Sequence, residues 1–291
     1  MTTENSTTAT PHATAFGTRR FGAVNWLGLW TLYQKEVRRF TKVAFQTIFA
    51  PIISTLLFLL VFMGAWGARG TGIVMENLAT GDLVEFAVTV FLPPGLIMMA
   101  IISNAFQNSS STLIIAKVQG SIVDILMPPL SAAELMIAIV AGAATRGLLV
   151  GFVTALTVTA FTWGDVQPLQ HLWAVLYFSA MAAILMGMIG AIAGMWAEKF
   201  DQLALISNFV ITPLTFLSGT FYSMRSAWLP DFVLLFSQVN PVFYLIDGFR
   251  YGFIGVSDAS PLTGALVILG LNIVTGGITY YLFKTGYKLK A

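Results

Sequence analysis

The sequence has 291 residues, of which 57% are hydrophobic and 10% are charged, and its formal net charge at pH 7 is +2. Soluble domains carry about 25% charged residues, so this composition excludes an ordinary soluble domain, and the small net charge gives no reason to expect a nucleic-acid partner. Cysteine is absent and histidine occurs twice, which excludes disulfides and cysteine nucleophiles and speaks against a metal site built on cysteine or histidine.

The N-terminal part of the sequence divides into a polar tail and a two-faced segment. Residues 1–24 are rich in threonine, serine and alanine, and we predict that they are disordered because they bury too little apolar surface to offset the entropy of ordering. In residues 25–42, helical spacing places aromatic and aliphatic side chains opposite Lys35, Arg38, Arg39 and Lys42. This pattern predicts an amphipathic helix lying in the membrane interface; a plain basic flank of the first span is the alternative.

Long apolar runs follow, and they predict an all-α integral membrane protein. Six spans are expected, at residues 45–66, 84–108, 132–162, 172–196, 203–223 and 262–283. The runs 229–238 and 240–255 are each too short to cross a bilayer. They are predicted to form two short re-entrant or interfacial helices between spans five and six.

The distribution of lysine and arginine predicts the orientation. With the N-terminus inside, eleven of the fifteen basic residues fall in cytoplasmic segments and three, Arg69, Arg225 and Arg250, fall outside. Because cytoplasmic loops carry the excess of lysine and arginine, both termini are expected to be cytoplasmic. The fifteenth, Arg146, lies about 14 residues into the third span; its expected role is structural anchoring by snorkelling or by contact with helix-end carbonyls, with substrate binding as the alternative.

The segment between spans two and three, KVQGSIVDILMPPLSAAEL at residues 117–135, is too polar to cross a bilayer. Ile122, Ile125 and Leu126 recur at helical spacing, and Pro128 ends any helix. Ser131 and Glu134 have the spacing of a capping box that would begin the third span. The segment is therefore predicted to be a short two-faced helix on the cytoplasmic side.

The sequence contains no motif that would supply energy or catalysis. A phosphate-binding loop of the form G-x-x-x-x-G-K-[ST], an H-E-x-x-H zinc motif and a G-x-S-x-G nucleophile turn are all absent. Ionisable groups inside the spans are also scarce, whereas ion-coupled transporters need them at membrane depth. We therefore expect no catalytic site and no metal site in this chain, and we expect a docking point for a partner that holds an energy source.

The chain resembles the membrane subunit of type-2 ATP-binding cassette (ABC) exporters, and among them the bacterial multidrug-like permeases. Five stretches carry the resemblance: FLPPGLIMMAIISNAF at 91–106, VQGSIVDILMPPLSAAEL at 118–135, ATRGLLVG at 144–151, LSGTFY at 217–222 and NPVFYLIDGFR at 240–250. The resemblance implies one permease domain over residues 25–291 in the bacterial cytoplasmic membrane. It does not extend to the N-terminal tail.

The resemblance also implies roles for residues. The short helix would couple the permease to a separate ATPase, which would bind the ATP and Mg that this chain lacks, through Gly120, Ile122, Asp124, Ile125, Leu126 and Pro128. An outer gate would include Asn240, Pro241, Asp247 and Arg250, the last two near enough in a helix to pair. The substrate path would include Phe58, Phe62, Phe91, Asn104, Phe209, Thr212, Phe216 and Tyr222.

The expected function is therefore ATP-driven export of an amphipathic or hydrophobic substrate (drug-, lipid- or glycan-like) by two permease copies, surrounded by membrane lipids, with two ATPase copies. A membrane anchor or assembly subunit without a transport path is the alternative. An intramembrane enzyme is disfavoured by the missing catalytic groups.

Overall fold

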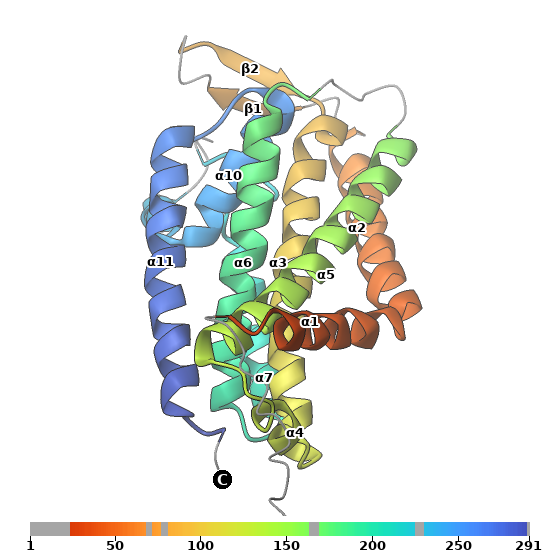
Figure 1. Ribbon diagram of the computed structural model, residues 1–291. Coiled ribbons are helices and arrows are strands. Elements are labelled where there is room, and N and C mark those ends of the chain that lie inside the picture. Colours follow the sequence, from red (N-terminus) through yellow and green to blue (C-terminus); the bar gives the residue numbers. More distant parts are fainter. Residues whose placement is uncertain (1–23, 68–71, 77–80, 163–168, 225–229, 290–291) are drawn as a thin grey trace, which may run out of the picture.

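The structure is a computed structural model that describes residues 24–67, 72–76, 81–162, 169–224 and 230–289. Five of its helices are long and apolar enough to cross a membrane. They are α2 (Ala44–Gly67), α3 (Val88–Val118), α5 (Ala132–Phe161), α6 (Leu172–Trp196) and α11 (Pro261–Thr285). These helices stand side by side in Figure 1, with α3 packed among α2, α5 and α6.

The amphipathic helix α1 (Trp26–Thr41) lies across the bundle (Figure 1). Its inner side buries Leu32, Glu36 and Phe40, while Trp26 and Trp30 remain exposed. The predicted helix is confirmed, and its exposed tryptophans suit a membrane interface. Residues 1–23 of the predicted disordered tail lie outside the described residues.

Helix α3 differs from the predicted second span at both ends. It begins at Val88 because residues Leu83–Phe86 form strand β2, which pairs antiparallel with β1 (Ile73–Glu76). It continues ten residues past the predicted end at 108, through the polar run Gln107–Ser111, to Val118. Ser109 and Ser110 donate to backbone carbonyls one turn earlier, so their hydroxyls are satisfied inside the helix and the run does not break it.

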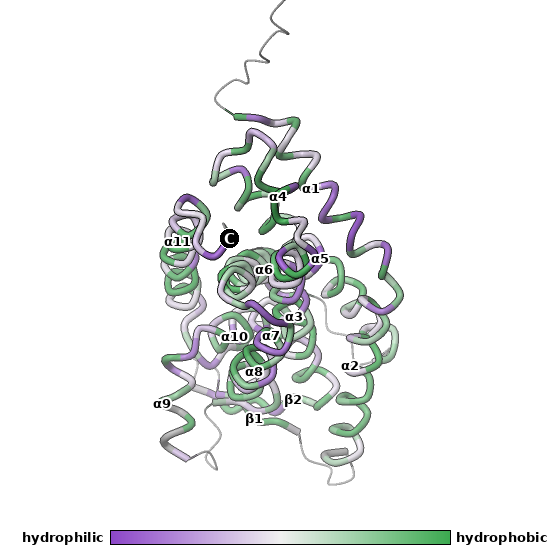
Figure 2. Tube along the Cα trace, turned by 90° about the horizontal axis from the view of Figure 1, so that it is seen from below, coloured by the Kyte–Doolittle hydropathy of each residue, from purple (hydrophilic) through white to green (hydrophobic). Residues whose placement is uncertain are grey.

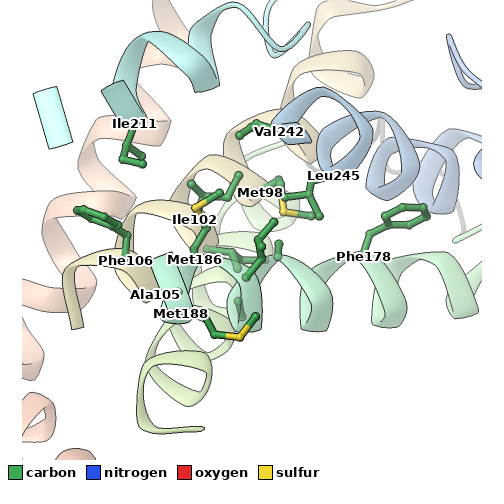
Figure 3. Packing of buried hydrophobic residues seen from close by; sticks show 14 of the residues in the cluster. Met98, Ile102, Ala105, Phe106, Phe178, Met186, Met188, Ile211, Val242 and Leu245 are labelled. Atoms are coloured by element: carbon green, nitrogen blue, oxygen red, sulfur yellow. The ribbon is translucent and has the colours of Figure 1, made fainter. Parts of the chain in front are cut away.

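Glycines allow α3 to pack closely against its neighbours. A Cβ atom at Gly190 of α6 would lie 2.4 Å from the carbonyl oxygen of Phe106, and one at Gly194 would lie 2.7 Å from that of Ser110. The small-residue spacing of α6 is thus a helix-packing device. Beside this contact lies a core of α3, α6 and α10 side chains, including Met98, Phe106, Phe178 and Leu245 (Figure 3).

The predicted fifth span is not a single regular helix in the structure. It consists of α7 (Phe200–Ile206), the π-helical turn η1 (Ser207–Ile211) and α8 (Thr212–Phe216). Together they make an apolar helix of 17 residues, which is about 26 Å long. Pro213 supplies no backbone donor, and the hydroxyl of Thr212 donates to Ser207 O at 2.9 Å across the wide turn.

The predicted pair of short helices is present as α9 (Asp231–Val239) and α10 (Pro241–Ile254). Asn240 caps α10 by accepting from Val242 N at 3.0 Å, Pro241 occupies the first turn, and Gly255 ends the helix with φ +74°. The β1–β2 hairpin and α4 (Ile122–Leu126) lie at opposite ends of the bundle in Figure 1. These ends are called the hairpin end and the α4 end below.

Candidate functional site

Helix α4 is a five-residue helix beyond the level at which α1 contacts α3. Thr112 of α3 contacts α1, and α3 then runs on to Val118 before the chain turns at Gly120, which has φ +69°. The capping box predicted at Ser131 and Glu134 is formed in full. Viewed from the α4 end, α4 lies next to α1 (Figure 2).

The side of α4 that the structure leaves exposed is not the apolar side that the sequence predicted. Ile125 is 4% exposed and packs with Leu32, Leu113 and Leu135 in a core of the chain itself; Ile122 is partly buried against the same core. Of the three apolar residues predicted for the coupling helix, Leu126 alone is exposed, because one side of so short a helix attaches it to the bundle. Val123 and Met127, which lie next to this exposed side, are 54% and 76% exposed. Gly120, Asp124 and Pro128 are exposed as well.

Glu134 connects α4's C-terminal loop with two helices. Its carboxylate accepts from the backbone amides of Ser131 and Asn25, and the Asn25 side chain donates to Pro129 O at 3.2 Å. The beginnings of α1 and α5 are therefore held together beside the loop that follows α4. Farther along the same end, Lys117 donates to Met195 O at 2.7 Å.

A buried polar cluster, the α1 anchor, joins the middle of α1 to α3. Glu36 is 1% exposed; it accepts from Thr112 Oγ1 at 2.6 Å and pairs with Arg39 at 3.1 Å. Arg39 also donates to Asn108 O and to Ser111 Oγ. The sequence pattern places Arg39 on the basic side of the helix and does not by itself mark Glu36. The signal that could have found Glu36 is an acid three residues before an arginine on an otherwise basic face.

Replacing Glu36 by alanine is expected to destabilise the fold by about 3 kcal/mol, because it leaves a largely desolvated arginine unpaired. Thermal unfolding of the purified protein in detergent measures this loss. Glu36→Gln keeps the shape and an acceptor for Thr112, and is expected to lose less. Equal stability of the wild type and Glu36→Ala would show that α1 is not held by this cluster.

The residues predicted to form the outer gate meet at the hairpin end, but Asp247 and Arg250 do not pair. Asp247 accepts from the backbone amides of Asp258 and Ala259, at 2.8 and 2.9 Å. Arg250 donates to Gly219 O, and its guanidinium carbon lies 4.0 Å from the centre of the Phe91 ring. Each side chain thus contacts a different loop, and the predicted ion pair is wrong. The spacing of two residues shows whether their side chains can meet within one helix, but it gives no information about other segments that lie nearby.

The segment 217–224 is held from several sides at this end. Asn240 donates to Leu214 O and to Ser218 Oγ, at 2.9 and 2.7 Å. Asp258 accepts from Ser223 Oγ at 2.6 Å and from Met224 N at 3.0 Å. Thr220 lies against α3, where a Cβ atom at Gly95 would be 2.9 Å from its carbonyl oxygen. The LSGTFY segment therefore forms one unit with α10 and the loop before α11.

The residues predicted for the substrate path are not brought together at one site. Phe58 and Phe62 contact Phe221, and Phe58 also contacts Phe216. Phe91 is fully buried beneath Arg250, Phe209 is 75% exposed, Thr212 bonds within its own helix and Tyr222 is partly buried. Phe58 and Asn104 do share a cavity of about 490 Å³ between α2, α3 and α5.

The α4 end also holds a surface ion pair in which the C-terminal segment meets the loop after α6. Lys288 Nζ lies 2.7 Å from Glu198 Oε1. The hydrogen bond from Lys288 lowers the pKa of Glu198, and the same bond raises the pKa of Lys288. Because both groups are exposed to solvent, the pair contributes little to stability.

Comparison with known proteins agrees with these features. Residues 28–254 match the family of ABC-2 type transporters. The chain is 35% identical over 267 residues to the inner membrane transport permease YadH of Escherichia coli K12, covering 91% of this chain and 98% of the relative. It is 24% identical over 250 residues to nodulation protein J of Rhizobium meliloti, covering 86% of each chain.

A family match over most of the chain, together with five helices long enough to cross a membrane, fixes the class of protein. Permeases of this family typically work with an ABC ATPase. The chain belongs to the ABC-2 type transporter family and is a multi-pass permease subunit of the bacterial inner membrane.

Proposed function

We propose that the chain is the membrane-spanning subunit of an ATP-driven exporter, with two copies assembling with two separate ATPase subunits. The α4 end faces the cytoplasm, and so do both termini. ATP and Mg are bound by the ATPase, and this chain supplies the path for an amphipathic or hydrophobic substrate. The proposal rests on family membership and on the arrangement of α4.

The observation that carries the proposal is that α4 is attached on one side and free on the other. Ile125 fixes the helix to the core, while Val123, Leu126 and Met127 leave an apolar surface uncovered at the tip of the bundle. An amphipathic helix in a groove is a common recognition mode. A partner that grips this surface would move α3 and α5 together, because α4 lies between them in the chain.

The polar contacts near α4 suit the transmission of such a movement. Glu134 ties the beginning of α5 to α1, and Lys117 ties the end of α3 to α6. Displacement of α4 would therefore be shared by four helices. At the hairpin end, the segment 217–224 and α10 form the proposed outer gate, and the π-helical turn η1 offers a place where the intervening helix can bend.

The proposal assigns the sixth crossing to α7, η1 and α8, with α9 and α10 entering the membrane from outside without crossing it. Leu205, Phe209 and Val210 on the short helix are 55%, 75% and 46% exposed. Phe216, near its end, contacts Phe58 of α2. An uncovered apolar face beside α2 suits contact with a second copy of the permease, which supports the homodimer.

The proposed orientation predicts the labelling of single cysteines in a chain that has none of its own. Met127→Cys and Leu83→Cys are well matched, since the replaced side chains are 76% and 75% exposed at opposite ends. In intact cells, a membrane-impermeant maleimide should label Leu83→Cys and leave Met127→Cys unlabelled until the cells are opened. Labelling of Met127→Cys from outside would overturn the orientation.

The export function is tested with the purified complex of the permease and its ATPase in lipid nanodiscs. Transported compounds are expected to stimulate ATP hydrolysis, because substrate and ATP are coupled through α4. A panel of amphipathic compounds that leaves hydrolysis unchanged, in a complex that hydrolyses ATP, would favour the membrane-anchor alternative.

A further inference from the structure

The cavity between α2, α3 and α5 is polar at one end and apolar at the other. Its α4-end part is lined by Gln46, Thr47, Asn104, Gln107 and Arg146. Phe58, Leu96 and Met99 line the other end, and the hydroxyl residues Ser54, Thr55 and Ser103 lie between. From Val43 to Phe58 the lining spans sixteen residues of chain, almost all in α2, and the fifteen rises between them correspond to about 22 Å of helix. The cavity thus has the length and the polarity gradient of an amphiphile.

The position of α1 along the bundle indicates where the polar end of the cavity lies in the membrane. Arg39 of α1 contacts Asn108, and Arg146 donates to Asn104, one helical turn farther from the α4 end. Tyr33 of α1 contacts Thr145 directly at 3.0 Å. If α1 lies in the interface, as its exposed tryptophans favour, then Arg146 lies just within the inner leaflet.

The polar end has a surplus of positive charge and of hydrogen-bond donors. Glu36 pairs with Arg39, whereas Arg146 has no carboxylate partner in the described part of the chain. Arg146, which lines the cavity, has a buried Nε that makes no hydrogen bond in the structure. The same holds for Arg39 Nε and Asn108 Nδ2, which lie outside the lining. Buried donors without a partner are costly, so an acceptor with negative charge would stabilise this place.

We propose that this cavity binds an amphiphile with an acidic headgroup, phosphate or carboxylate, taken from the inner leaflet. The headgroup accepts from Arg146, and the apolar chain runs along α2 toward Phe58. Interpreting the bound amphiphile as cargo rests on the proposed export function; the binding site itself does not.

The binding site is tested with the full-length permease alone, purified in a neutral maltoside detergent. Dodecyl phosphate is the probe, dodecyltrimethylammonium has the same chain with a cationic head, and inorganic phosphate has the headgroup without the chain. Because a ligand that binds the folded state raises the unfolding temperature, dodecyl phosphate should raise it saturably. The other two compounds should not do so at the same concentrations.

Arg146→Gln is expected to weaken the binding of dodecyl phosphate about tenfold or more, because it removes a charge-assisted hydrogen bond. Lys42→Gln, a change at an exposed lysine outside the cavity lining, should leave binding unchanged. Ala50→Trp adds bulk to the cavity lining, leaves Arg146 in place and should weaken binding as well. This variant decides the test if Arg146→Gln fails to fold.

Equal stabilisation by both amphiphiles, or by inorganic phosphate alone, would overturn the proposal, as would unchanged binding in Ala50→Trp. The permease–ATPase complex then separates cargo from a resident acidic lipid. Stimulation of ATP hydrolysis by dodecyl phosphate, lost in Ala50→Trp, supports cargo. If dodecyl phosphate binds without stimulating ATP hydrolysis, the cargo interpretation is contradicted and the binding site is still supported. If other compounds stimulate hydrolysis in that complex, the export function is still supported too.

Discussion

Replacing Leu126 and Met127 together by aspartate is expected to abolish association with the ATPase and ATP-driven transport, while the permease still inserts and folds. Both side chains are exposed in the permease alone, so the change costs the fold little. In the complex, each aspartate would be a charge without a partner in an apolar contact, which costs several kcal/mol. Since about 1.4 kcal/mol is a factor of ten in affinity, binding should fall at least a hundredfold.

Two comparisons make this prediction specific. Val74 and Leu83 are exposed apolar residues of the β hairpin at the opposite end, so Val74→Asp with Leu83→Asp adds the same charge and should leave association intact. Ile125→Asp introduces a charge into the core and should lower the yield of folded protein. Normal association in Leu126→Asp with Met127→Asp would show that this surface of α4 does not bind the ATPase.

Asp247→Ala is expected to destabilise the hairpin end by about 2–6 kcal/mol. The Asp247 side chain is 3% exposed and accepts from two backbone amides. Removing it leaves both donors without their carboxylate partner, and each unsatisfied buried donor costs about 1–3 kcal/mol. Thermal unfolding in detergent measures the loss, and protease sensitivity of the loop around Asp258 should rise with it.

Asp247→Asn serves as the intermediate variant, because its single carbonyl oxygen can still accept one of the two bonds. Asp201→Ala removes an exposed carboxylate of α7 and should change stability little. An unfolding temperature for Asp247→Ala equal to that of the wild type would mean that these two hydrogen bonds do not hold the loop before α11.

The features that the sequence predicted well depend on local patterns. The apolar run of α6 begins and ends at Leu172 and Trp196, within the predicted span at 172–196. The capping box at Ser131 follows from a hydroxyl and a carboxylate three residues apart. The short helices α9 and α10 follow from runs that proline and asparagine interrupt. In each case the residues that decide the structure are neighbours in the chain.

The features that the sequence did not reveal depend on contacts between distant segments. The second span was predicted to end at 108, yet α3 continues through this polar region and buries Asn108, Ser109 and Ser110 against α1 and α6. Ile125 could face either the bundle or a partner, and helical spacing cannot distinguish the two. Asp247 lies near enough to Arg250 in sequence to pair, yet backbone amides of the next loop take its carboxylate.

The central claim is that α4 is the contact through which a separate ATPase drives this permease. It is tested most directly by placing a photo-crosslinking amino acid at position 127 of the full-length chain in its native membrane. We expect an ATP-sensitive crosslink to one protein that carries a phosphate-binding loop and supports ATP hydrolysis in the purified complex, and no such product from position 83. A complex that hydrolyses ATP but crosslinks only from position 83, or from neither position, would contradict the account.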